Sequence, residues 1–262
     1  MSMNVLIIKL GATGDVVRTT PLLRRLDGPV SWVTAENNLA LLQGTDREMR
    51  CVSWENRKGV ADTTYDLVIN LEDDRETSSF LKELKFKQLF GAHLNGDDNL
   101  TYTSDSRGWF DLSLISIYGR EQADRLKLLN RRTYQELIFD GLGLGFNGET
   151  YYLPPPRPTG LQGDVVISST AGPIWPMKKW AYYDELKNEL KSGGLKVNTL
   201  QSRSTVLEHL ADVQGLTAVW FLAIACPCTW RWAAVCDAFR FLPARVDEKY
   251  EASGINLCFW AQ

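Results

Sequence analysis

The sequence VLIIKLGATGDVVR, residues 5–18, joins an aliphatic run to a glycine-containing turn and a carboxylate. Four consecutive aliphatic residues, Val5 to Ile8, are typical of a strand that is buried on both faces of a parallel sheet. Gly11 and Gly14 predict a tight turn, and a helical pattern follows. Asp15 is therefore expected just beyond the carboxyl end of the first strand, where open α/β sheets bind their ligands.

Two interpretations of Asp15 remain open at this point. An aspartate near a helix N-terminus can act only as a cap, because its carboxylate accepts a backbone N–H and complements the helix dipole. The other interpretation is a functional carboxylate. The turn is not a phosphate-binding loop of a known type, since GATGD is neither G-x-G-x-x-G nor a Walker sequence.

Composition favours a soluble α/β protein with two halves. The chain has 262 residues, a net charge of −3 and a pI near 5.6, which argues against non-specific nucleic-acid binding. The sequence contains no long apolar run and no signal-peptide pattern, so a cytoplasmic location is expected. Only Cys51 of the five cysteines precedes residue 226, which excludes a disulfide framework for the body of the chain.

The local patterns predict an alternation of strands and helices after the first turn. Strands are expected at 30–34, 49–54 and 65–71, helices at 37–42 and 77–88, a surface loop at 100–109, and one or two helices within 120–140. The acidic run Glu72-Asp73-Asp74 follows a predicted strand. Paired carboxylates can hold a metal, but we interpret this run as a solvated turn and predict no metal site.

Prolines mark the main boundary of the chain. Four of the five residues from Pro154 to Pro158 are prolines, which gives a stiff connector that no helix or central strand can include. A new strand is predicted at 164–169. We therefore expect a first domain at 1–153, a linker at 154–163 and the start of a second domain at 164–214.

The run from Ile8 to Leu23 resembles the opening of glycosyltransferase family 9, the ADP-heptose lipopolysaccharide heptosyltransferases. The resemblance implies an α/β fold of GT-B type, with two Rossmann-like halves and an active site in the cleft between them. It implies that Asp15 is the catalytic base and that Thr13, Gly14 and Arg18 bind the acceptor. It also implies an inverting enzyme that needs neither a metal nor a cofactor.

A second match to this family lies at the start of the second half. The family has a Lys-x-Trp-Pro signature whose lysine meets the donor diphosphate, and Lys178-Lys179-Trp180 fits it, with Ala181 replacing the proline. A fixed cation there would stabilise the charge that builds up on the leaving phosphate. Lys178 is the expected catalytic cation, Lys179 is the competing assignment, and Ser169 and Thr170 are expected hydroxyl donors to the same phosphates.

The composition of the chain changes after Gln214. Residues 215–262 hold four of the five cysteines and lack the Gly-Asp-Ser or Gly-Asp-Thr loop with which the family holds its donor. If Leu222 to Ala225 are back-translated as CTG GCG ATA GCC, the triplets that start at the third base read GGC GAT AGC. In this second frame they encode Gly-Asp-Ser. We therefore hypothesise that the coding sequence shifts frame near Gln214, that the C-terminal half is incomplete, and that activity is weak or absent.

The function expected from these observations is transfer of heptose from ADP-heptose to the inner core of lipopolysaccharide. The partners would be a nucleotide sugar, the lipopolysaccharide acceptor and, by peripheral contact, the inner face of the inner membrane. One alternative is a non-catalytic saccharide-binding remnant of such an enzyme. The other is a Rossmann-type oxidoreductase, which the missing G-x-G-x-x-G disfavours.

Overall fold

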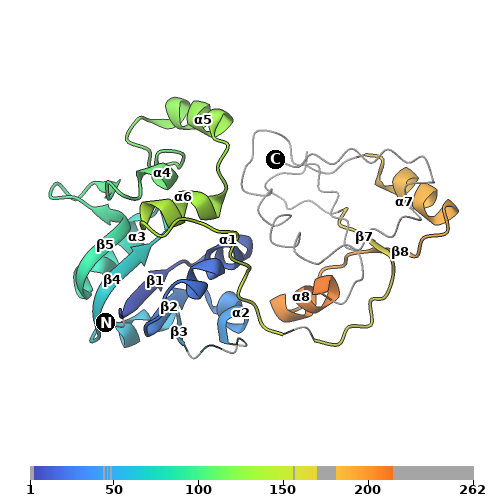
Figure 1. The fold of residues 1–262 in the computed structure, drawn as a ribbon, viewed down its shortest axis with the longest axis horizontal. Coiled ribbons are helices and arrows are strands. Elements are labelled where there is room, and N and C mark those ends of the chain that lie inside the picture. The colour runs from blue at the N-terminus through green and yellow to red at the C-terminus, as the bar shows by residue number, and fades with distance from the viewer. Residues whose placement is uncertain are drawn as a thin grey trace. The chain divides into compact units, whose positions relative to one another are not determined.

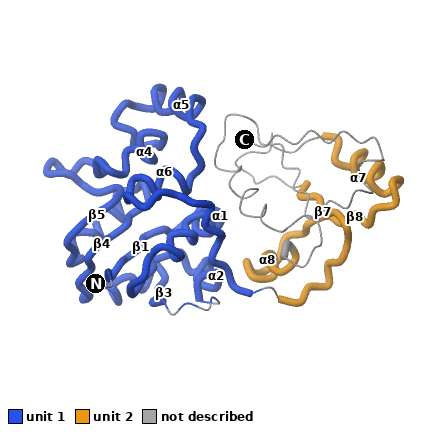
Figure 2. The backbone as a smooth tube through the Cα atoms, viewed as in Figure 1, with its two compact units in different colours: residues 1–155 blue, residues 156–262 orange. Residues whose placement is uncertain are grey.

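The computed structural model describes residues 3–43, 45, 47, 49–155, 157–169 and 181–214. The chain divides into two compact units, residues 1–155 and 156–262 (Figure 2). The division falls within the proline-rich segment that was expected to link two domains. Each unit is described by itself below.

Unit 1 is built on a six-stranded sheet with the order β3-β2-β1-β4-β5-β6 (Figure 1). β1 pairs in parallel with β2 on one side and with β4 on the other, β3 and β5 extend the parallel sheet, and β6 closes it antiparallel to β5. The strands are β1 (Val5–Ile8), β2 (Val30–Thr34), β3 (Arg50–Ser53), β4 (Thr64–Asn70), β5 (Lys85–Leu94) and β6 (Leu100–Tyr102). The expected parallel α/β architecture is thus confirmed.

Helices cover both faces of this sheet. The α-helices of unit 1 are α1 (Thr13–Thr19), α2 (Leu39–Gln43), α3 (Arg75–Phe80), α4 (Arg107–Phe110), α5 (Arg120–Leu129) and α6 (Tyr134–Gly141). The 3₁₀ segments are η1 (Thr20–Arg24), η2 (Glu36–Asn38), η3 (Trp54–Val60) and η4 (Leu81–Glu83). The expected helical region at 120–140 is therefore two helices, α5 and α6.

Two of the sequence-based expectations are wrong in detail. The helix expected at 77–88 ends much earlier, as α3 and η4, and β5 begins at Lys85. Exposed Lys85 and Lys87 flank a half-buried Phe86, so the segment has the two-residue period of a strand, and pairing with β4 decides its conformation. The expected loop at 100–109 contains β6 and the start of α4, because residues 100–102 pair with the end of β5.

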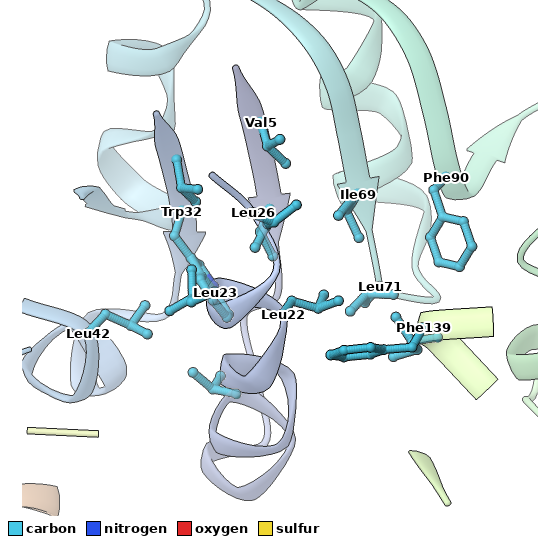
Figure 3. Packing of buried hydrophobic residues seen from close by; sticks show 14 of the residues in the cluster. Val5, Leu22, Leu23, Leu26, Trp32, Leu42, Ile69, Leu71, Phe90 and Phe139 are labelled. Atoms are coloured by element: carbon cyan, nitrogen blue, oxygen red, sulfur yellow. The ribbon is translucent and has the colours of Figure 1, made fainter. Parts of the chain in front are cut away.

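The aliphatic run of β1 contributes to the core on both faces of the sheet. Val5 and Ile7 pack in one cluster with residues of α1, η1, α2 and α6, whereas Leu6 and Ile8 pack in a second cluster with residues of η3, α3 and η4. Figure 3 shows the first cluster, in which Leu22 and Leu23 lie between Trp32 and Leu71. Complete burial of such an aliphatic side chain contributes about 2 kcal/mol, so β1 anchors both layers of helices.

Two arginines that follow α1 bind the last residues of unit 1. Arg25 forms an ion pair with Glu149 and donates to the carbonyl oxygen of Leu144 at 2.9 Å, and Arg24 donates to the carbonyl oxygen of Thr150 at 2.9 Å. The backbone N–H of Tyr152 donates to the Thr20 hydroxyl at 3.0 Å. Residues 144–152 therefore belong to the first unit.

The described part of unit 2 is a β-α-β unit followed by a helix. β7 (Val165–Ile167) and β8 (Val197–Thr199) pair in parallel, α7 (Tyr183–Ser192) lies between them in the sequence, and α8 (Val206–Gln214) follows. The carboxylate of Asp212 on α8 is buried and accepts hydrogen bonds from Arg203 and Thr159. Unit 2 thus begins as the expected Rossmann-like half, with a parallel pair of strands and a crossover helix.

We expect Gly91→Ala to destabilise unit 1 strongly. Gly91 has a φ of +119°, and an added Cβ would lie 1.9 Å from the carbonyl oxygen of Asn70 on β4. Both the backbone strain and the clash oppose folding, and we expect a loss of at least about 2 kcal/mol in urea unfolding. Gly96→Ala is the matched control, because a Cβ there meets nothing within 4 Å; equal losses for both variants would contradict this account of β5.

Candidate active site

Asp15 lies on the first turn of α1, directly beyond the carboxyl end of β1. Its side chain is 11% exposed. The N-cap of α1 is Ala12, and no side chain caps this helix end. Asp15 therefore lies at the carboxyl edge of the sheet, in the first turn of α1, where its charge also complements the helix dipole.

Arg18 lies one turn further along α1 and faces the same carboxylate. Its Nη1 is 3.6 Å from Oδ1 of Asp15, and its guanidinium stacks on the ring of Tyr134 at 4.5 Å from the ring centroid. The Nε of Arg18 is buried and has no hydrogen-bond partner in the described part of the chain. A buried N–H of a cation is costly without an acceptor, so this atom points to a missing hydrogen-bonding group.

The ring of Tyr134, the first residue of α6, packs against the guanidinium of Arg18. Its hydroxyl is 2.8 Å from the Thr19 hydroxyl, and its ring meets Trp109 edge to face at 4.5 Å. Burial raises the pKa of the Tyr134 phenol far above its usual range, and the negative charge of Asp15 raises it further. The phenol is therefore neutral near pH 7, and its ring packs against the Arg18 guanidinium.

A buried ion pair fixes the segment between β1 and Asp15. The ammonium group of Lys9 lies 2.9 Å from Oε1 of Glu72, and both side chains are largely buried. The same oxygen accepts the backbone N–H of Leu10 at 2.6 Å and that of Gly11 at 3.2 Å. Oε1 of Glu72 therefore contacts one cation and accepts hydrogen bonds from two consecutive backbone N–H groups just before the turn.

This arrangement corrects the interpretation of residues 72–74 as a solvated turn. Glu72 faces the first strand, and Asp74 caps α3 by accepting the backbone N–H of Thr77 at 2.8 Å. Neither Lys9 nor Glu72 was among the functional residues expected from the sequence. A signal was present, because Lys9 is the first residue after β1, Glu72 is the second residue after β4, and these two strands are parallel neighbours.

The other two residues expected on the acceptor side have different environments. The Thr13 hydroxyl donates to Oδ1 of the buried Asn38 at 2.8 Å, and the amide group of Asn38 in turn donates to the carbonyl oxygen of Leu10 at 2.8 Å. Thr13 therefore helps to shape the turn. Gly14 is half-buried within α1, beside Asp15.

The expected donor-side residues are mostly outside the described ranges. Ser169 follows β7 and is half-buried, whereas Thr170, Lys178 and Lys179 and the tail at 215–262 lie outside the described residues. Within the described ranges, no group of three or more His, Cys, Asp or Glu side chains could hold a metal ion. In the same ranges, no helix combines the length and the apolar character needed to cross a bilayer.

The fold recurs in solved glycosyltransferases. By sequence, the chain matches no protein-family model and no curated protein. By structure, it is similar to the Escherichia coli heptosyltransferase WaaC with ADP-2-deoxy-2-fluoro heptose, with a TM-score of 0.55 and 14% identity over 90% of this chain and 86% of that one.

Two further solved structures are similar to the chain. A family 9 glycosyl transferase from Veillonella parvula has a TM-score of 0.52 and 17% identity, over 84% of this chain and 70% of that one. The E. coli ADP-heptose lipopolysaccharide heptosyltransferase II has a TM-score of 0.51 and 11% identity, over 84% and 78%. The α/β fold of GT-B type is therefore confirmed, and so is the resemblance to family 9 at the level of the fold.

We expect the Lys9–Glu72 pair to behave as a buried, mutually dependent pair. Lys9→Met leaves the Glu72 carboxylate without its cation, and the expected loss is about 3 kcal/mol in urea unfolding. Adding Glu72→Gln should recover part of this loss, because a glutamine can still accept the two N–H groups and carries no charge. Strictly additive losses in the double-mutant cycle would contradict coupling between the two side chains.

Proposed function

We propose that the chain is a glycosyltransferase in which Asp15 is the general base. The observation that supports this most directly is the buried Asp15 carboxylate, which lies beside Arg18 at the carboxyl edge of the parallel sheet. The similarity to solved heptosyltransferases supports it through the shared fold.

In the proposed reaction, Asp15 takes the proton of an acceptor hydroxyl as the hydroxyl oxygen attacks the anomeric carbon of the donor sugar. The new carbon–oxygen bond forms as the bond to the diphosphate breaks, and the nucleoside diphosphate leaves with the electron pair. Attack on the face opposite the leaving group inverts the anomeric centre. A carboxylate in hydrogen-bond reach of the hydroxyl contributes about 10²- to 10⁴-fold to such a step.

Arg18 would orient the acceptor in this proposal. Its guanidinium is fixed by the Tyr134 ring and by Asp15, which leaves the buried Nε as a donor that still lacks a partner. An oxygen of a sugar hydroxyl, phosphate or carboxylate would satisfy it. A hydrogen bond to a charged guanidinium contributes about 1.5–3 kcal/mol, enough to favour one acceptor orientation over another.

The specific substrates we propose are ADP-heptose as donor and the lipopolysaccharide inner core as acceptor, with no metal ion required. WaaC has been solved with an ADP-heptose analogue, and heptosyltransferase II is named for ADP-heptose and lipopolysaccharide. On the donor side, Lys178 would support the departing diphosphate, and Ser169, Thr170 and Lys179 would complete its binding.

In a version of the chain whose residues after Gln214 are restored to the second frame, we expect Asp15→Asn to lower transfer from ADP-heptose to lipopolysaccharide core by about 10²- to 10⁴-fold without changing ADP affinity. Product formation followed by mass spectrometry and ADP titration by calorimetry separate the two effects. Asp27→Asn is the matched control, because Asp27 is exposed and precedes the amino end of β2, at the opposite edge of the sheet. Full activity in Asp15→Asn would exclude the proposed base.

The same titration tests the alternative of a saccharide-binding remnant and the hypothesis of a shifted frame. A version of the chain with residues after Gln214 restored to the second frame should bind ADP more tightly than the chain as it stands. Binding of core saccharide without ADP affinity or transfer in either version would favour the remnant. Tight ADP binding by the present chain would instead show that its own tail completes the donor site.

A further inference from the structure

Unit 2 contains a cavity whose described lining residues have no part in the proposed reaction. The volume of the cavity is about 500 Å³, which is within the range of small-molecule sites in proteins. Its walls come from α7, from all of β8, and from the segments that precede β7 and follow β8. The described walls therefore lie within unit 2 alone.

The wall of this cavity is cationic, although the whole chain has a net charge of −3. The described lining residues include Lys187, Lys191 and Arg203 and no aspartate or glutamate. Lys187 and Lys191 are four positions apart on α7, so they lie on the same face of the helix and repel each other. Neither lysine forms an ion pair within the described ranges. An anion close to both ammonium groups would remove this repulsion.

A hydrogen bond fixes the first of the two lysines beside β8. The Nζ of Lys187 donates to the Thr199 hydroxyl at 2.9 Å, and Lys187 is half-buried where α7 packs beside β8 (Figure 1). An ammonium group has three N–H donors, and the other two have no partner within the described ranges. A neutral hydroxyl offsets only part of the desolvation cost of a half-buried cation. The environment of Lys187 therefore favours an anionic ligand.

A buried carboxylate joins two separate parts of the wall. Asp212 of α8 is 2% exposed and accepts hydrogen bonds from Nη2 of Arg203, at 3.1 Å, and from the Thr159 hydroxyl. The Thr159 hydroxyl in turn accepts the backbone N–H of Leu161, a lining residue, at 3.2 Å. Arg203 and the segment before β7 are thus fixed to the same helix, which lowers the entropic cost of binding a ligand in the cavity.

The amide group of Asn198 supplies a fixed polar contact in the wall. Its Nδ2 donates to the carbonyl oxygen of Gln162 at 2.8 Å, and its Oδ1 has no hydrogen-bond partner within the described ranges. A Cβ at Gly163 would lie 2.3 Å from Nδ2, so a glycine at that position leaves room for this arrangement. Gln201 adds a second amide to the lining. Amide groups both donate to and accept from hydroxyl groups, which suits a hydroxylated ligand.

We propose that this cavity binds a sugar phosphate. Lys187 and Lys191 would contact the phosphate group, which carries about −1.5 to −2 charges near pH 7, and Arg203 would add positive charge to the wall. Asn198 and Gln201 would form hydrogen bonds with the sugar hydroxyls. A nucleotide fits less well, because none of the described lining residues is aromatic and a base would have no ring to stack on.

The ligand of this cavity would be neither the donor nor the acceptor of the proposed transfer. Ser169, the described residue of the expected donor site, follows the carboxyl end of β7 and is not among the lining residues. The cavity instead includes Leu161, which precedes the amino end of that strand. Sugar phosphate and ADP should therefore bind unit 2 independently.

Calorimetric titration of the full chain with glucose 6-phosphate tests the proposal. We expect glucose 6-phosphate to bind about tenfold more tightly than inorganic phosphate, because the amide groups add hydrogen bonds to the sugar. Glucose itself should not bind measurably. Lys187→Gln and Lys191→Gln should each weaken binding by about tenfold, since each removes a hydrogen bond to a charged group. Excess ADP should leave the affinity for glucose 6-phosphate unchanged.

Lys196→Gln is the matched control, because Lys196 is exposed, directly precedes β8 and is not a lining residue. It should bind glucose 6-phosphate as the unchanged chain does, and circular dichroism should show that every variant is folded. Lys191 is exposed, so its replacement leaves the packing of α7 intact.

Four results would each overturn the proposal. They are no binding of glucose 6-phosphate or inorganic phosphate, equal affinities for these two ligands, equal binding by Lys191→Gln and the unchanged chain, and displacement of glucose 6-phosphate by ADP. A failure of the proposed glycosyl transfer is a different result, because Asp15 lies in unit 1 and transfer is measured separately.

Discussion

The burial of β1 on both faces is the constraint on which the rest of unit 1 depends. A strand with parallel partners on both sides and helices over both faces has no solvent-facing side, which is why Val5 to Ile8 are all aliphatic. Polar residues cannot lie within such a strand, so they first occur after its carboxyl end. The polar residues that follow are therefore concentrated at one edge of the sheet, and Asp15 is among them.

The polar groups at that edge form a nearly self-contained network. Lys9 and Glu72 neutralise each other, and Glu72 also accepts the N–H groups of the two residues after Lys9. Arg18 stacks on Tyr134 and lies 3.6 Å from Asp15. Such an arrangement of fixed charges costs desolvation energy and is tolerated where it positions reactive groups. Among the described residues, the Nε of Arg18 is a buried donor of this network that has no hydrogen-bond partner.

Unit 1 also separates its polar edge from its apolar surface. The polar residues around Asp15 come from α1, from α6 and from the segments that follow β1 and β4, whereas exposed apolar side chains lie in the turn before α5 and on α5 itself: Leu114, Ile117, Tyr118, Leu128 and Leu129. Only Ala123 of α5 is fully buried. The two exposed leucines at the end of α5 are therefore not part of the core of unit 1.

The sequence by itself determined the parallel sheet and the turn that bears Asp15, because both depend on local patterns of aliphatic and glycine residues. The helix expected at residues 85–88 was wrong, because Lys85 to Lys87 alternate in exposure as a strand does and the segment pairs with β4. Only the tertiary structure decided that Glu72 turns inward to Lys9 and that Tyr134 supports Arg18. These contacts join residues 62 or more positions apart, and no local pattern specifies which distant side chain will occupy a buried position beside a charge.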